Sequence, residues 1–163
     1  MFSAYREALN ATNPFYRLLC FYRVIEGVKK LRTQRRATAL SAGNEYREPP
    51  DERIPSAESD CGSSDPAILD SFKPYLGKKF TWVLNQMRSL LRNAVAHLDP
   101  EGDTLDADKY GDIATCEQGL PVLKYISRVM LHNELQTDLD YRNAPIRQQV
   151  SEARKQIDYL NPN

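Results

Sequence analysis

The chain has 163 residues, of which 41% are apolar, and its 22 basic side chains equal its 22 acidic ones in number. This length suits one domain with its own core, and zero net charge predicts no polyanionic partner from charge alone. There is no apolar run of about 20 residues, so we expect no membrane span. Since there is also no charged-then-apolar leader and no close pair of cysteines, we expect a reduced, cytoplasmic protein without a disulfide scaffold or cysteine-ligated zinc.

The first predicted elements are a short helix over residues 2–10 and a long helix that begins at Asn13-Pro14. Asparagine is a favourable N-cap, and proline at the first helical position loses no hydrogen bond. Apolar side chains then recur about every 3.6 residues, which predicts one buried stripe. The stripe consists of Phe15, Leu18, Leu19, Tyr22, Ile25, Val28 and Leu31. Basic side chains crowd the end of this helix: Lys29, Lys30, Arg32, Arg35 and Arg36.

Residues 37–65 have a different character. They contain three prolines and many small polar or acidic residues, with almost no apolar spacing. Such a segment buries too little apolar surface to offset its ordering entropy. We therefore predict a long, mobile polar insertion between two helices, followed by a short helix over residues 66–72 that ends or bends at Pro74.

The strongest helical pattern runs from about Gly77 to Leu98. Its apolar stripe consists of Phe80, Val83, Leu84, Met87, Leu90, Leu91, Ala94 and Leu98. Pro100 disfavours helical geometry at the residue before it, so this helix should end near Leu98. Trp82 is expected in the core or in an interface.

Two further helices are predicted, over about residues 120–135 and 145–160. The inner face of the first consists of Val122, Leu123, Ile126 and Met130, and the second has a narrow stripe typical of a peripheral helix. His132 is expected at the surface or in packing. No strand-like alternation of useful length appears. We therefore predict an all-α fold, an antiparallel bundle of four or five helices, with a helical domain over 1–142 and a peripheral C-terminal helix over 143–163.

Residues 99–117 are strongly acidic, with seven carboxylates against one lysine. Asp99, Glu101 and Asp103 take the first ligand positions of a calcium loop, but Thr104 and Tyr110 stand where such a loop needs glycine and glutamate. We therefore predict a solvated loop, and neither a metal nor a cofactor for the chain. An acidic cover over the basic surface and a calcium-responsive adaptor are the alternatives.

The stretch from Arg92 to His97 combines chemistry-bearing side chains near the end of the strongest predicted helix. Asn93 and His97 share a helix face, so the amide can orient the imidazole. Arg92 and His97 lie about 140° apart around an ideal helix. For both side chains to contact the same substrate group, the helix must be locally distorted, the arginine side chain must reach around it, or a second protomer must supply one of the two. The structural alternative is a histidine stabilised by the helix dipole and an arginine paired with a surface carboxylate.

Residues 92–97 resemble the R-x4-H signature of the HEPN superfamily, in which asparagine commonly follows the arginine. The order of helices from Asn13 to Leu135 also resembles that family. The segment NPFYRLLCFYRVIE, residues 13–26, is similar to HEPN-like proteins from methylamine-utilisation gene clusters.

This resemblance implies a homodimeric helical bundle that acts as a metal-independent endoribonuclease in RNA processing, phage defence or toxin–antitoxin systems, or a catalytically silent relative. His97 would be the acid–base catalyst, Arg92 would stabilise charge on the phosphate, and Asn93 would orient His97 or contact the phosphate. Lys79 and the basic cluster over 29–36 would guide RNA, and the alternative for these cations is a solvated surface. The alternative is a non-catalytic module that dimerises or binds a nucleotide or a protein partner such as an antitoxin.

Overall fold

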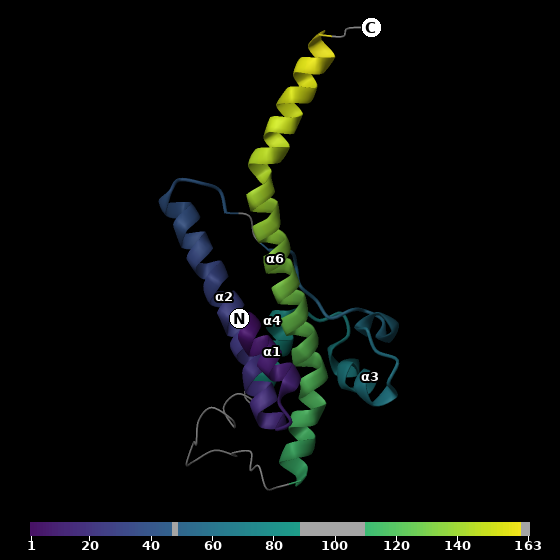
Figure 1. The fold of residues 1–163 in the computed structure, drawn as a ribbon. Coiled ribbons are helices and arrows are strands. Elements are labelled where there is room, and N and C mark those ends of the chain that lie inside the picture. The colour runs from purple at the N-terminus through teal and green to yellow at the C-terminus, as the bar shows by residue number, and fades with distance from the viewer. Residues whose placement is uncertain (47–48, 89–109, 161–163) are drawn as a thin grey trace. The chain divides into compact units, whose positions relative to one another are not determined.

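The computed structural model describes residues 1–46, 49–88 and 110–160, and these residues contain five α-helices, two 3-10 helices and no strand (Figure 1). The predicted all-α fold is therefore confirmed. The elements are α1 Phe2–Asn10, α2 Pro14–Ser41, η1 Glu58–Cys61, α3 Pro66–Phe72, η2 Lys73–Tyr75, α4 Phe80–Met87 and α6 Tyr110–Leu160. None of these helices combines the length and the hydropathy needed to cross a lipid bilayer.

Backbone contacts divide the chain into two compact units, Met1–Leu131 and His132–Asn163. The helix α6 runs through this division as one element, so the prediction of separate helices over 120–135 and 145–160 is wrong. Pro145 lies inside α6, where it removes one backbone donor without ending the helix. A domain boundary at 142/143 stays a prediction.

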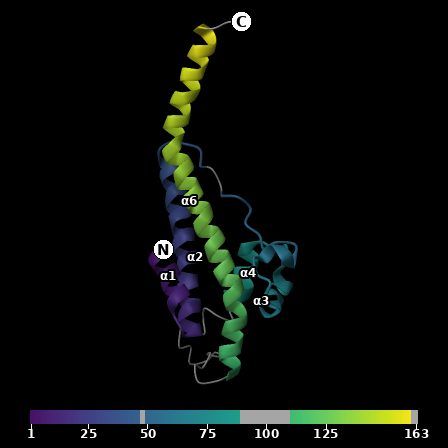
Figure 2. The same cartoon turned by 45° about the vertical axis from the view of Figure 1, so that its right-hand side comes forward.

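The helix α2 lies at the centre of the core. Asn13 caps it, because its side-chain oxygen accepts a hydrogen bond of 3.0 Å from the Tyr16 amide. α1 packs antiparallel to α2 (Figures 1 and 2), and the rings of Tyr5 and Phe21 meet edge to face at 5.8 Å. The buried side chains of α2 are Leu18, Cys20, Phe21, Tyr22, Val24, Ile25 and Val28. They cover more than the single predicted stripe, so α2 is packed on several sides.

The segment over 37–65 is more structured than the sequence predicted. Its first residues continue α2 to Ser41, and its later part buries the side chains of Ile54 and Cys61 in the core. The Ile54 amide donates to the Lys78 carbonyl at 3.0 Å, and the Phe80 amide donates to the Glu52 carbonyl at 2.9 Å. The segment therefore pairs with the start of α4. Two isolated apolar residues give no periodic signal, which is why the pattern predicted a mobile insertion.

One ion pair ties this segment to α2. The two terminal nitrogens of Arg32 donate to the two carboxylate oxygens of Glu52 at 2.9 and 2.8 Å. These side chains are only 15% and 10% exposed. A bidentate, largely buried pair of this kind is stronger than a surface ion pair. Arg32 therefore has a structural partner, and its role in guiding RNA stays a prediction.

The helix α4 begins at Phe80 rather than at the predicted Gly77. Gly77 has a φ of +69°, a left-handed conformation that interrupts helical geometry. The first part of the predicted stripe is confirmed, because all four of its members in α4 are buried: Phe80, Val83, Leu84 and Met87. The remainder of the predicted helix, up to Leu98, lies outside the residues that the structure describes.

The first part of α6 completes the core. The helix begins at Tyr110, so the end of the predicted acidic loop is helical, and the predicted inner face from Val122 to Met130 is buried. The Ser127 hydroxyl donates to the Phe21 carbonyl at 3.2 Å inside the core. Up to Leu131, α6 runs in the same direction as α2 (Figures 1 and 2), so not all neighbouring helices of the bundle are antiparallel.

We expect Arg32→Ala to destabilise the protein by about 1–3 kcal/mol, because it leaves the Glu52 carboxylate largely buried without its bidentate partner. Glu52→Gln should lower the free energy of unfolding by less than Arg32→Ala does, because the neutral amide oxygen can still accept a hydrogen bond from Arg32. Urea unfolding of Arg32→Ala, Glu52→Ala and the double variant measures the coupling. Additivity of the two single changes to within about 0.5 kcal/mol would contradict this account.

Candidate functional site

The predicted catalytic residues Arg92, Asn93 and His97 lie outside the residues that the structure describes, so their roles stay predictions. The structure does describe the chain that leads to them. α4 ends at Met87, and Arg88 keeps right-handed helical angles, with φ −62° and ψ −43°. A hollow of about 590 Å³ opens beside Met87 and is also lined by side chains of α3 and α6.

The predicted RNA-binding cations do not form one uncompensated basic surface. Arg32 is paired with Glu52, and the Lys79 ammonium lies 3.4 Å from a carboxylate oxygen of Asp51. The hydrogen bond from Arg53 and the charges of Arg53 and Lys79 lower the pKa of Asp51, so this carboxylate stays ionised at neutral pH. The remaining members of the cluster are exposed or half-buried: Lys29, Lys30, Arg35 and Arg36.

The two other side chains singled out in the sequence are both exposed. Trp82 is 43% exposed and does not lie in the core, so of its two expected positions the one in an interface stays a prediction. The Lys78 ammonium lies 5.6 Å from its ring centroid, a cation–π contact. His132 is exposed, which agrees with the predicted surface position.

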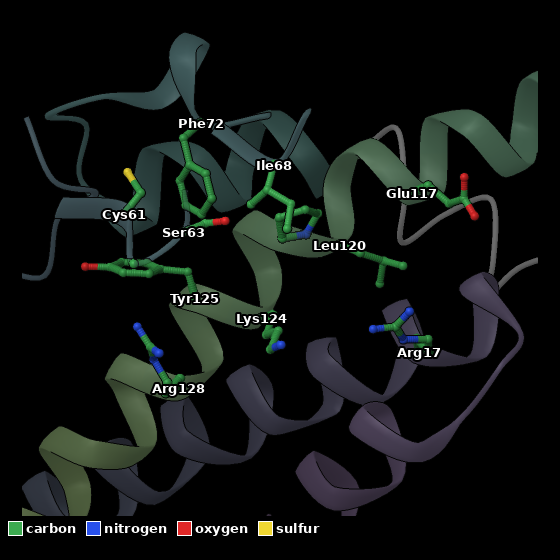
Figure 3. A pocket seen from close by; sticks show the side chains of 12 residues that line it. Arg17, Cys61, Ser63, Ile68, Phe72, Glu117, Leu120, Lys124, Tyr125 and Arg128 are labelled. Atoms are coloured by element: carbon green, nitrogen blue, oxygen red, sulfur yellow. The ribbon is translucent and has the colours of Figure 1, made fainter. Parts of the chain in front are cut away.

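A pocket of about 420 Å³ lies where α3, the start of α2 and the first part of α6 meet (Figure 3). One wall is apolar and is formed by Ile68, Phe72, Leu120 and Pro121. Tyr125 connects this wall to the core, because its ring meets those of Phe72 and Phe80 edge to face at 5.7 and 6.2 Å. The other wall carries three basic side chains: Arg17, Lys124 and Arg128.

The loop between η1 and α3 shapes one end of this pocket. Gly62 has a φ of +76° and ends η1, and a β-carbon at this position would lie 3.5 Å from a terminal nitrogen of Arg128. The next turn is fixed by two short bonds, because the Asp65 amide donates to the Ser63 hydroxyl and the Asp65 carboxylate caps α3. The Arg128 guanidinium is therefore bounded by the loop.

Among the described residues, the three basic side chains of the pocket have no acidic partner. Across the part of the chain that the structure describes, no ion pair joins Arg17, Lys124 or Arg128 to a carboxylate. Arg17 instead donates through its Nε to the Ala8 carbonyl at 3.2 Å, and Arg128 lies over the Tyr125 ring at 5.6 Å. Within the described part of the chain, Glu117 is the one acidic residue that lines the pocket. The pocket therefore carries two more positive than negative charges.

The titratable neutral groups of the pocket are protonated at neutral pH. Burial, with smaller contributions from Asp60 and Glu58, raises the pKa of the Cys61 thiol, and burial likewise raises the pKa of Tyr125. No cluster of three metal-ligating side chains occurs within residues 1–46, 49–88 and the described side chains of α6. With their pKa values raised, neither Cys61 nor Tyr125 is a ready nucleophile at neutral pH.

Sequence analysis assigned no function to any residue of this pocket. The lining residues come from four separate segments, and none of them forms a motif by spacing. Arg17 lies next to a helix start and Lys124 and Arg128 lie on a helix face, where basic residues are ordinary. Only the i and i+4 spacing of Lys124 and Arg128 could have suggested that they share a face.

We expect Cys61 to react slowly with iodoacetamide in the folded protein at pH 7, because the raised pKa and the burial both reduce the reactive thiolate. Its rate should be at least about tenfold below that of a cysteine in a short peptide and should rise with pH through the alkaline range. Residue-resolved mass spectrometry measures this rate, with the fully buried Cys20 as the unreactive control. Peptide-like labelling of Cys61 at pH 7 would contradict the assignment.

Residues 1–132 match the family model described as methylamine utilization protein MauJ. Searches of curated proteins and of solved structures gave no match. The matched range nearly coincides with the compact unit Met1–Leu131, and it includes every lining residue of the cationic pocket as well as Arg92, Asn93 and His97. Since the match covers well over half of the chain, this protein belongs to the MauJ family of methylamine utilization proteins.

Proposed function

We propose that this protein is a HEPN-like, metal-independent endoribonuclease whose Arg92 and His97 act on an RNA phosphodiester in a cleft between two protomers. The observation that carries the proposal is the motif Arg92-Asn93-x3-His97, which follows α4 closely in an all-α chain. The long α2 before it and α6 after it agree with the order of helices expected from the resemblance.

The proposed chemistry needs only these side chains. His97 takes the proton from a ribose 2′-hydroxyl, or protonates the leaving 5′-oxygen, and two protomers supply one imidazole for each task. An unperturbed imidazole has a pKa of about 6.5, so both protonation states are accessible near neutral pH. Arg92 stabilises the charge on the phosphate through its planar guanidinium, and the product end is a 2′,3′-cyclic phosphate.

The surroundings of α4 support this proposal further. The chain passes the hollow of about 590 Å³ beside Met87 only five residues before Arg92. Open space beside α4 is compatible with a site that must admit a polymer. The exposed members of the basic cluster on α2 are Lys29, Lys30 and Arg36.

A second candidate function is a non-catalytic module that dimerises or binds a nucleotide or a protein partner. The observation that favours it is the pairing of Arg32 with Glu52 and of Lys79 with Asp51. Sequence-independent RNA affinity comes mainly from neutralising phosphates with basic side chains. At least two of the six predicted RNA-guiding cations are offset by carboxylates, and the whole chain has no net charge.

We expect the wild-type protein to cleave RNA in the presence of a chelator and to leave 2′,3′-cyclic phosphate ends. His97→Ala should reduce cleavage by about 10²–10⁴-fold, because it removes the acid–base group. Arg92→Lys should recover only part of the activity lost in Arg92→Ala, because an ammonium cannot form the bidentate contact. His132→Ala, at the exposed second histidine, is the matched control and should cleave normally.

Light scattering after size exclusion separates the two candidate functions. A folded, dimeric wild-type protein that leaves a broad set of RNAs intact would show that the endoribonuclease proposal is wrong. If Arg92→Ala then changes dimerisation or nucleotide affinity, the non-catalytic module is supported. Cleavage that persists in purified His97→Ala would point to a contaminating nuclease and would likewise count against the assigned residues.

A further inference from the structure

We propose that the pocket between α3, α6 and the start of α2 binds a small organic anion, a molecule with a phosphate or carboxylate head and an apolar body. The head meets the basic wall of Arg17, Lys124 and Arg128, and the body lies against the apolar wall around Phe72. This site does not involve Arg92 or His97, so the inference stands apart from the proposed nuclease.

The positive charges of the basic wall favour an anionic ligand. Lys124 and Arg128 are four residues apart on one face of α6, where like charges repel each other. Arg17 brings a third positive charge to the same pocket, and among the described residues none of the three forms an ion pair. Arg32, by contrast, is compensated by Glu52. An anion between the three cations relieves their repulsion.

Two of the three cations, Arg17 and Arg128, are held by contacts within the protein. Arg128 lies over the Tyr125 ring and beside Gly62, and the Nε of Arg17 is bonded to the Ala8 carbonyl. Each guanidinium is anchored by one side, which leaves its other donors for a ligand. Side chains that are ordered before binding lose less conformational entropy when they bind. Arg17 and Arg128 are therefore partly ordered before a ligand binds, while Lys124 and Arg128 stay accessible from solvent.

The shape of the pocket favours a ligand that has both a charged head and an apolar body. Figure 3 shows Arg128, Lys124 and Arg17 along one side, with Cys61, Phe72 and Ile68 on the opposite side. A volume of about 420 Å³ lies within the range of small-molecule sites. An inorganic ion would leave the apolar wall without contact, and a neutral apolar molecule would leave the cations without a partner. A compact amphipathic anion uses both walls.

The test uses the full chain and four probes: phenyl phosphate, benzoate, inorganic phosphate and benzyl alcohol. Calorimetric titration should show that phenyl phosphate, benzoate or both bind more tightly than inorganic phosphate and benzyl alcohol. The two aromatic anions separate a phosphate head from a carboxylate head. Because charged contacts carry the binding, affinity should also fall as the salt concentration rises.

Variants assign the binding to this pocket. Lys124→Gln and Arg128→Gln should each weaken the preferred aromatic anion by about fivefold or more, because each removes a charge-assisted contact. Arg23→Gln is the matched control, because Arg23 is an exposed arginine of α2 that does not line the pocket. Circular dichroism of each variant checks that it is folded, and Lys124 is exposed enough for its change to be tolerated.

Three results would overturn this inference. The first is no binding of either aromatic anion up to about 10 mM. The second is an equal loss of affinity in Arg23→Gln, which would indicate a general charge effect. The third is a loss in Arg92→Ala without a loss in Lys124→Gln, which would place the probe at the motif instead. A negative RNA cleavage assay leaves the inference intact, so the two proposals fail separately.

Discussion

The burial of α2 on several sides is the constraint on which the rest of the compact unit depends. Leu18, Phe21 and Ile25 are fully buried on one stripe of α2, and the buried Cys20 and Tyr22 lie on either side of that stripe, so the helix needs neighbours around more than half of its circumference. Each such side chain contributes about 1.5–3 kcal/mol when it leaves water. α1 supplies one neighbour, and the first part of α6 supplies another through the hydrogen bond from Ser127 to the carbonyl of Phe21. This bond satisfies a hydroxyl that would otherwise be costly to bury.

The direction of these helices determines where the pocket forms. α2 and the first part of α6 run the same way, so the chain between them must return before α6 begins (Figure 1). Tyr125 packs against Phe72 of α3 and Phe80 of α4 and thereby anchors that returning chain to α6. The side chains of α6 then divide by periodicity: Leu123 and Ser127 face the core, whereas Lys124 and Arg128 line the pocket. One helix thus supports both the core and the cationic wall.

The sequence predicted those parts of the fold that depend on local pattern. The N-cap at Asn13 is a signal at one residue, and the buried stripes of α4 and α6 are apolar patterns that repeat within one helix. All three were predicted correctly. Other features depend on distant partners or on backbone angles, which the spacing of residues in the sequence does not encode. These features are the burial of Ile54, the break before α4 at Gly77 and the continuity of α6 through Pro145. The cationic pocket was missed for the same reason, because Arg17 and Arg128 meet only after the chain has folded.

The total charge of a protein is a poor guide to where it recognises anions, because pairing rather than number decides which cations are available. The chain is neutral, and its most conspicuous basic segment includes Arg32, which is bound on both terminal nitrogens by Glu52. The pocket holds fewer basic residues than that segment, yet Lys124 and Arg128 have no carboxylate partner in the described structure. Electrostatic attraction is also stronger in a partly enclosed, apolar-walled pocket than on an open helix end. The uncompensated cations of the pocket therefore carry more recognition potential than the longer basic run.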